Sequence, residues 1–243
     1  MRRVWESLLN VLYPAACFGC GCCTEQPGFC RPCRVRIQTP ASPLCPTCGA
    51  PFRTRADIDH PCIRCLQHPP GFGRARACAI YDAADTGQHP LKTVLQHYKY
   101  NRDVWLARPL AALLAERAPL AVGSYDLIVP VPLHVQRLRW RGFNQAQLLA
   151  YPLARAVGVR LDPHSLERMR PTRPQVELGE KERRHNVAGA FRVTHPERVD
   201  GRRILLVDDV YTTGATVNEC SRTLMRAGSA SVDVLVLARA VLH

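Results

Sequence analysis

Continuous apolar runs, without the alternation of a half-exposed strand, recur along this chain. They lie at residues 77–81, 125–132, 202–208 and 231–238. A strand that is buried on both faces has this pattern, which is typical of a parallel sheet covered by helices. The sequence therefore predicts an α/β fold built on a parallel sheet.

Between these runs, apolar residues recur at helical spacing. In residues 144–156, for example, Ala146, Leu149 and Leu153 fall on one side of a helix. Gly228 would end the last predicted helix, because glycine readily adopts the left-handed backbone that follows a helix C-terminus. The further helices are predicted at residues 91–98, 104–117 and 214–227. Strands followed by helices are the order of a sheet covered on both faces.

The first 70 residues have a different texture, rich in cysteine and proline. Frequent prolines make long helices improbable there, and such a segment cannot build a sufficient core without metal or disulfide staples. The Pro69–Gly71 stretch marks the boundary. We therefore expect a small N-terminal domain at residues 1–70 and a larger α/β domain at residues 72–243.

The N-terminus itself predicts a short amphipathic helix, with Val4, Leu8 and Val11 at helical spacing. A secretory signal is the alternative, but Glu6 and Asn10 interrupt the apolar stretch that a signal needs. No run reaches the roughly 18 apolar residues that a membrane span requires. We expect a cytoplasmic protein without a transmembrane segment.

Composition is ordinary for a globular protein of 243 residues, with 47% hydrophobic and 22% charged residues. The net charge of +13 is unusual, and arginine carries nearly all of it. The lysines are Lys92, Lys99 and Lys181. A basic surface attracts phosphorylated small molecules, nucleic acids and anionic membranes alike, and an arginine-rich composition can also reflect genomic base bias. Charge alone therefore does not choose the partner.

Cysteine clustering indicates structural zinc. Of twelve cysteines, ten lie before residue 66, mostly in C-x-x-C pairs whose spacing suits one tetrahedral ion. Sequential pairing predicts two Cys₄ sites for two structural Zn²⁺ ions. The predicted ligands are Cys17, Cys20, Cys30 and Cys33 for the first site, and Cys45, Cys48, Cys62 and Cys65 for the second. A shifted register that uses Cys20 and Cys23 is one alternative, and a redox or disulfide role for the whole set is another.

The sharpest signal is the segment at residues 204–216, ILLVDDVYTTGAT. An apolar strand leads into Asp208 and Asp209, and a Thr/Gly turn at residues 212–216 then opens a helix. Backbone N–H groups at a helix N-terminus bind phosphate, and the two carboxylates suit ribose hydroxyls and a magnesium-bound diol. A simple helix cap is the alternative, but it accounts for only one carboxylate. The pattern resembles the motif of type I phosphoribosyltransferases that binds 5-phosphoribosyl 1-pyrophosphate (PRPP).

Two polar loops follow or separate the predicted strands. The first, at residues 133–145, holds Leu133, His134 and three arginines that could clamp a pyrophosphate. A solvated basic loop is the alternative there, and His134 suits a structural role equally well. The second, at residues 168–186, is long, charged and poor in apolar residues, so we expect a mobile lid. An ordinary surface excursion is the alternative for this second loop.

Together these motifs resemble the ComF family, including the GntX-like proteins, over the whole chain. They read VPVPLH…RGFNQA, then R-x-R-x-T-x-x-Q, then LLVDDVYTTGAT. The resemblance implies a type I phosphoribosyltransferase fold, a parallel sheet flanked by helices, with a small N-terminal double zinc ribbon. The sequence departs from the family in its extra cysteines, Cys22 and Cys23.

The resemblance also implies roles for residues. Asp208 and Asp209 would contact ribose, and Arg183 in the lid would join them in catalysis. PRPP would be bound with Mg²⁺ by Leu133, His134, Arg137, Thr212, Thr213, Gly214, Ala215 and Thr216. The implied activity is phosphoribosyl transfer to an unspecified base or amine, with release of pyrophosphate.

The family is linked to competence and the use of external DNA, so single-stranded DNA or the DNA-uptake machinery is an expected partner. Two other interpretations remain open at this stage. One is a non-catalytic PRPP sensor that binds nucleic acid, and the other is a scaffold protein of DNA uptake.

Overall fold

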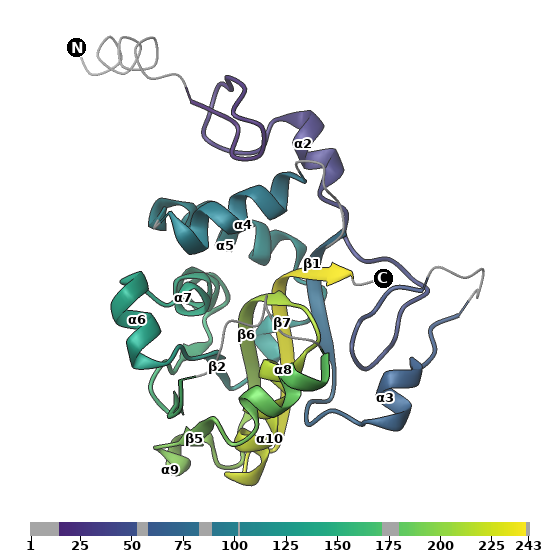
Figure 1. Ribbon diagram of the computed structural model, residues 1–243, viewed down its shortest axis with the longest axis vertical. Coiled ribbons are helices and arrows are strands. Elements are labelled where there is room, and N and C mark those ends of the chain that lie inside the picture. The colour runs from purple at the N-terminus through teal and green to yellow at the C-terminus, as the bar shows by residue number, and fades with distance from the viewer. Residues whose placement is uncertain (1–14, 53–57, 83–88, 102, 172–179, 242–243) are drawn as a thin grey trace.

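A parallel sheet lies at the centre of the computed structural model, which describes residues 15–52, 58–82, 89–101, 103–171 and 180–241. The strand order is β1-β7-β6-β2-β3, and every neighbouring pair is parallel (Figure 1). The strands are β1 (Ala75–Asp82), β2 (Leu127–Pro130), β3 (Arg160–Leu161), β6 (Arg203–Tyr211) and β7 (Ser231–Val241). The predicted α/β fold with a parallel sheet is confirmed.

Helices cover both faces of the sheet, and each face has its own apolar core. One face packs on α4 (Pro90–Tyr100), α5 (Ala107–Arg117), which the 3₁₀ turn η1 (Val104–Leu106) precedes, and α7 (Gln145–Val157). The other face packs on α10 (Ala215–Arg226). The smaller elements are η2 (Val122–Ser124), α6 (Val135–Arg141), α8 (Glu180–Val187), α9 (Pro196–Val199) and the antiparallel pair β4 (Leu166–Arg168) and β5 (Phe191–Val193).

Local sequence signals explain where the helices begin and end. The Asn144 side chain caps α7 by accepting hydrogen bonds from the backbone N–H groups of Ala146 and Gln147. Gly158 ends the same helix with a φ of +70°, which other residues rarely adopt. The helix predicted at residues 144–156 therefore agrees with α7 to within one residue at each end.

The strand that carries the two aspartates is longer than its apolar run predicts. β6 continues through Asp208 and Asp209 to Tyr211, because Val210 and Tyr211 still pair with β7. The carboxylates therefore belong to the strand, where successive side chains point to opposite faces. Asp208 falls on the α10 face, and Asp209 falls on the face that packs on α4.

Both predicted polar loops contain helices. Residues 135–141 form α6, and residues 180–187 form α8, which packs against α10. Residues 180–186 of the expected lid are therefore helical, and the buried Val187 anchors this helix. The mobility of the lid stays a prediction. Residues 172–179 of the expected lid, and the helix expected near the N-terminus, lie outside the described residues.

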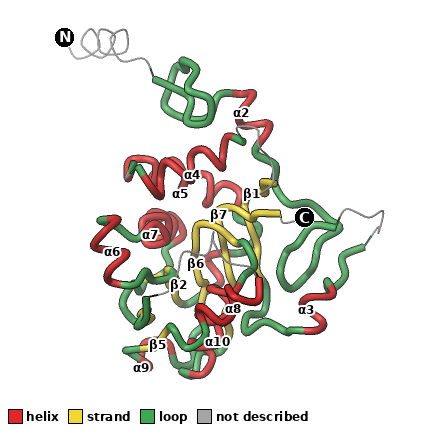
Figure 2. Tube along the Cα trace, viewed as in Figure 1, coloured by secondary structure: helices red, strands yellow, loops and turns green. Residues whose placement is uncertain are grey.

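The N-terminal segment is mostly loop and turn, as its proline content predicts (Figure 2). Its helices among the described residues are the short α2 (Arg31–Arg36) and α3 (Ile63–Gln67). We call residues 17–33 the first ribbon and residues 45–65 the second ribbon. The first ribbon lies near η1, where Phe18 makes an edge-to-face contact with Trp105. Cys45 and Cys48 of the second ribbon are part of the apolar core beneath the sheet, together with Phe72.

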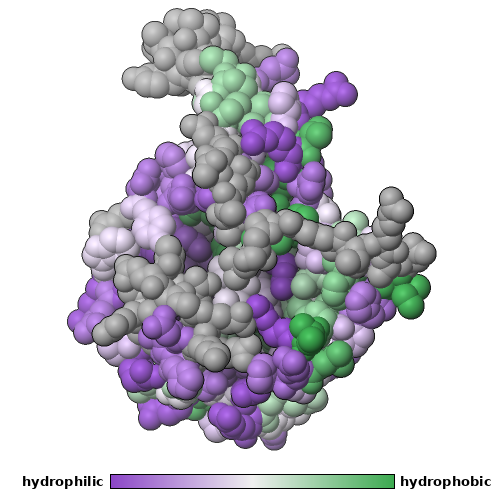
Figure 3. Space-filling model, turned by 45° about the vertical axis from the view of Figure 1, so that its right-hand side comes forward, coloured by the Kyte–Doolittle hydropathy of each residue, from purple (hydrophilic) through white to green (hydrophobic). Residues whose placement is uncertain are grey.

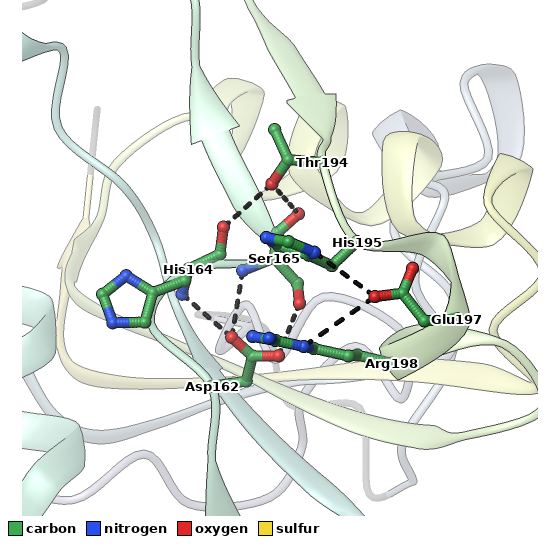
Figure 4. Close-up of polar contacts among 7 residues, drawn as sticks. All are labelled: Asp162, His164, Ser165, Thr194, His195, Glu197 and Arg198. Carbon is green, nitrogen blue, oxygen red and sulfur yellow. Dashed lines mark hydrogen bonds and ion pairs between the residues drawn. The ribbon is translucent and has the colours of Figure 1, made fainter.

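A polar cluster stabilises the turn after β3, at the edge of the sheet opposite β1. The buried Asp162 carboxylate accepts hydrogen bonds from the backbone of His164 and Ser165 and from the Ser165 hydroxyl. Thr194 donates its hydroxyl to the His164 carbonyl, which ties β5 to the turn before β4 (Figure 4). Because the carboxylate is saturated by its own turn, this cluster offers little to a ligand.

Hydrophilic residues dominate the face drawn in Figure 3, but apolar green surface lies on the side that carries α3. Three apolar side chains there are strongly exposed: Ile58 and Ile63 of the second ribbon, and Leu66 directly after it. Among the described residues, no helix is long and apolar enough to cross a membrane.

Candidate functional site

The turn between β6 and α10 is shaped for a phosphate. Gly214 has a φ of +78°, and a Cβ at this position would overlap the Tyr211 hydroxyl. Only glycine therefore fits there. The turn leads into a helix of 12 residues, whose first N–H groups lack partners within the helix. The buried hydroxyl of Thr213 makes no hydrogen bond, so the turn holds donors without acceptors.

Asp208 lies beside this turn with a strongly altered acidity. Burial, followed by repulsion from Asp209, raises the pKa of its carboxyl group to about 8. The Asp208 carboxylate accepts a hydrogen bond from the Asp209 backbone N–H at 2.8 Å. A buried carboxyl with a raised pKa, in contact with a second one, is a feature of functional sites.

Lys99 of α4 was missed by the sequence interpretation. Its Nζ lies 2.9 Å from Asp209 Oδ2, and the side chains are 21% and 5% exposed. Burial by itself lowers the pKa of Lys99, but attraction to the Asp209 carboxylate outweighs this and raises it. One feature of the sequence could have pointed to Lys99. Most cations of this chain are arginines, so a lysine indicates a position where arginine does not serve equally well.

Three arginines bring further positive charge to the same place. Arg137 and Arg141 lie one turn apart on α6, and Arg168 ends β4. Burial lowers the pKa of both Arg141 and Arg168, which means that these cations are poorly hydrated. Such cations gain from an anionic ligand that replaces the lost water.

These groups line one cavity of about 450 Å³ at the carboxyl ends of the central strands. Ligands of open α/β sheets bind at this edge. The lining includes three aromatic side chains, of which Tyr100 and Trp140 are 55% and 58% exposed. The charged and hydroxyl residues of the lining are Lys99, Arg137, Arg141, Arg168, Asp208, Asp209, Thr212 and Thr216.

The structure brings some predicted residues together and separates others. Leu133, Arg137 and the aspartates line the cavity with Thr212 and Thr216. His134 does not line this cavity; it caps α6 by accepting a hydrogen bond from the Gln136 backbone N–H at 3.4 Å, and its role as a ligand stays a prediction. Thr213, Gly214 and Ala215 line a small pocket that faces α3 instead. The Arg183 side chain lies outside the described part of the chain.

The eight predicted zinc ligands gather into two groups. In each group the four sulfurs lie within 4.8 Å of one another. Four sulfurs at about 2.3 Å from one zinc ion lie about 3.8 Å apart. The distances from Cys20 Sγ to Cys30 Sγ and from Cys48 Sγ to Cys62 Sγ are each 3.7 Å. The groups therefore fit tetrahedral zinc.

The surroundings of the sulfurs also suit a metal. Burial acts to raise the pKa of Cys17 and Cys45, but hydrogen bonds from backbone N–H groups prevail and lower it to about 6 and about 7. Thiolates are the form that binds zinc. Cys22 and Cys23 are exposed and lie outside both groups, which favours sequential pairing. All twelve cysteines are described, and all are free of disulfides.

Two family models match the chain. The model of the double zinc ribbon domain matches residues 8–66, and that of the phosphoribosyl transferase domain matches residues 144–241. Among curated proteins, the DNA utilization protein YhgH of Salmonella typhimurium is 38% identical over 87% of this chain and 90% of its own. Competence protein F of Haemophilus influenzae is 33% identical over 88% and 91% of the two chains. Competence protein ComFC of Bacillus subtilis is 26% identical over 86% and 83%.

Solved structures give weaker likenesses. A glutamine PRPP amidotransferase of B. subtilis aligns at 21% identity and a TM-score of 0.37, over 54% of this chain and 25% of its own. An adenine phosphoribosyltransferase of Thermoanaerobacter pseudethanolicus aligns at 18% identity and a TM-score of 0.36, over 57% and 83%. Neither likeness is strong enough to bear on the function of this chain.

Proposed function

The chain belongs to the ComF family of competence and DNA utilization proteins, and we propose that it binds PRPP with Mg²⁺ and transfers the phosphoribosyl group to a nitrogen acceptor. One observation carries the proposal. A single cavity joins two adjacent carboxylates, the threonines at the two ends of the turn at 212–216, and several cations, of which Arg141 and Arg168 are poorly hydrated. PRPP carries a diol, a phosphate and a pyrophosphate, which match these three features.

Each part of PRPP has a complementary group. The N–H groups of the turn at 212–216 would bind the 5-phosphate, as helix N-termini do. Asp208 and Asp209 would accept hydrogen bonds from the ribose hydroxyls. Arg137 and the backbone of Leu133 would contact the pyrophosphate together with Arg141 and Arg168, since arginine donates to phosphate oxygens in pairs.

In the proposed reaction, the bond between ribose C1 and the pyrophosphate oxygen breaks, and its electron pair leaves with pyrophosphate. The lone pair of the acceptor nitrogen forms the new bond to C1, and that nitrogen then loses a proton. The carboxylates suit Mg²⁺ chemically, because this ion prefers oxygen ligands, and Mg²⁺ would neutralise charge on the leaving group. The protein contributes position and charge stabilisation.

Two parts of the proposal come from the sequence alone. Arg183 would assist the departure of pyrophosphate from its position on α8. A cytoplasmic location would keep the ribbon cysteines reduced. The acceptor is a base or an amine.

The test is calorimetric titration of the whole chain with PRPP and Mg²⁺, followed by an assay of pyrophosphate release over a panel of nucleobases and amines. We expect binding by the wild type and its loss in Asp208→Asn. Glu116→Gln, at an exposed position on α5, is the matched control. Binding that persists in Asp208→Asn would refute the assigned site, and binding without release for any acceptor would favour a PRPP sensor.

A second function, binding of single-stranded nucleic acid, is supported by a different observation. Exposed aromatic rings lie beside arginines at the cavity mouth, where the Arg141 guanidinium is 5.7 Å from the centre of the Tyr100 ring. Trp140 lines the same cavity between Arg139 and Arg141 in sequence. Bases stack on such rings while arginines follow the backbone. The names of the relatives, which refer to DNA utilization and competence, agree with this function.

A further inference from the structure

A buried arginine joins the sheet to the second ribbon. Arg239, near the end of β7, is 8% exposed. Its Nη1 donates to the backbone carbonyl oxygen of Cys48 at 2.7 Å, and its Nη2 lies 3.9 Å from the Cys48 sulfur. A zinc ion with four thiolates has negative charge in excess, so a guanidinium beside one sulfur stabilises the loaded site.

The same guanidinium lies against the wall of the phosphate turn. Its central carbon is 4.3 Å from the centre of the Tyr211 ring, and Tyr211 is 5% exposed. The Tyr211 hydroxyl in turn occupies the space where Gly214 would carry a side chain. A continuous series of contacts therefore runs from Cys48 through Arg239 and Tyr211 to Gly214.

A second connection reaches the turn from the other pair of cysteines. Arg64 lies on α3 between Cys62 and Cys65, and its Nη1 donates to the Thr213 carbonyl at 3.4 Å. Just beyond the second ribbon, the Gly71 N–H donates to the Asn218 side chain on α10 at 2.7 Å. The second ribbon therefore contacts the turn, and the residues that follow this ribbon contact the first part of α10.

We propose that Arg239 is a positioning residue that couples the second ribbon to the phosphate turn, so that metal binding at this ribbon orders residues 212–216. A segment held by a metal loses its order when a ligand is removed, because it lacks an apolar core of its own. A loosened turn must then be ordered by its ligand, which weakens binding. The consequence for PRPP affinity rests on the proposed function, whereas the ordering of the turn does not.

The first experiment measures PRPP affinity of the whole zinc-loaded chain by calorimetry. Arg239→Met keeps the apolar stem and removes both contacts to Cys48, and we expect a loss of affinity of about tenfold, the usual size of such couplings. Arg76→Met is the matched control. Arg76 also donates from the sheet to a carbonyl of the second ribbon, that of Pro46 at 2.8 Å, but it does not reach the turn. Equal affinities for the two variants would overturn the proposal.

The second experiment follows amide hydrogen exchange in the absence of PRPP. Cys62→Ser should accelerate exchange at residues 212–216, while the amides of β6 and β7 stay protected and report an intact sheet. Cys20→Ser, in the first ribbon, should accelerate exchange in α4 instead. Unchanged exchange at 212–216 in Cys62→Ser would overturn the coupling. If the wild type fails to bind PRPP, the proposed function falls and this experiment still decides the coupling.

Discussion

Asp208 and Asp209 are neighbours in sequence, but the structure gives them different surroundings. Asp209 faces Lys99 in a close ion pair, whereas burial holds the pKa of Asp208 at about 8. One carboxyl is therefore balanced by a cation, and the other stays protonated over much of the neutral range. This difference predicts distinct responses to pH and to mutation.

The first prediction concerns pH. An ordinary aspartate has a pKa of 3.8, so between about pH 4 and pH 8 the folded chain retains a proton on Asp208 that the unfolded chain has lost. The free energy of unfolding should fall as the pH rises through this window. Asp208→Asn should remove this slope, as urea unfolding at several pH values would measure. A wild-type slope that survives in the variant would contradict the assignment.

The same titration should govern the ligand. If PRPP requires an ionised Asp208, its affinity should fall by up to about tenfold for each pH unit below 8. Calorimetry in buffers of different ionisation enthalpy would detect the released proton. The phosphate of PRPP itself titrates near pH 6, which also changes the affinity with pH. The control is therefore the same titration with a phosphate ligand that lacks the ribose diol.

Lys99 provides a separate prediction at this scale. Lys99→Met should leave the Asp209 carboxylate buried without a cation, at a cost of about 3 kcal/mol. Thermal unfolding measures this loss of stability. Lys99→Arg retains the cation and should lie closer to the wild type; equal losses for both variants would mean that packing, not charge, is what Lys99 supplies.

At the scale of elements, the two ribbons differ in how they join the rest of the chain. The second ribbon places Cys45 and Cys48 in the core beneath the sheet, at 0% and 3% exposure. Its backbone also bonds to β1, where the Ala75 N–H donates to Thr47. The first ribbon instead leads into α2, which lies on α4 and α5. Arg34 of α2 is paired to Glu116, and Arg117 donates a hydrogen bond to the Ile37 carbonyl.

This difference predicts unequal consequences of metal loss. Cys45→Ser and Cys20→Ser should each lower the zinc content by about one ion, from about two per chain. Cys45→Ser should also lower the melting temperature of the sheet, because it places a hydroxyl in the shared core. Cys20→Ser should affect mainly the first ribbon. Elemental analysis and thermal unfolding measure both effects, and an equal melting temperature for the two variants would contradict this account.

At the scale of the whole molecule, the net charge of +13 is the dominant property. Charge of this size attracts any polyanion in dilute salt, so attraction alone does not demonstrate a specific site. What distinguishes a nucleic-acid surface is stacking combined with charge, and exposed aromatic residues lie at the mouth of the charged cavity.

We therefore predict that single-stranded DNA binds with a steep salt dependence, because arginines release counterions from the phosphates. Trp140→Ala should weaken binding by about 1–3 kcal/mol, the usual value of one stacked base. Ile63→Ala, at an exposed apolar position of the second ribbon, is the control. Fluorescence anisotropy across a salt series is the measurement. An affinity for DNA that does not change with salt concentration, or equal losses of affinity in the two variants, would show that this surface does not bind DNA.

Local patterns in the sequence determined the parts of this protein that depend on neighbouring residues. The apolar runs predicted the parallel sheet, the turn residues after Asp209 predicted a phosphate site, and the C-x-x-C spacing predicted two metal groups. The predictions of the sheet and of the two metal groups succeed because the interacting groups lie within a few residues of one another, so their geometry follows from the strand or the C-x-x-C turn alone. The phosphate site stays a prediction. The helix at 180–187 was not predicted, because it packs on α10 and local composition does not report such a contact.

Only the tertiary structure decided which distant residues meet. Lys99 reaches Asp209 because α4 packs across the end of β6, and Arg239 reaches Cys48 because the second ribbon lies under the sheet. The pattern of apolar and polar residues around Lys99 or Arg239 predicts neither contact. Which residues meet depends on the order of the strands in the sheet. His134 shows that a polar residue beside a site in sequence can also cap a helix, and its role as a ligand stays a prediction.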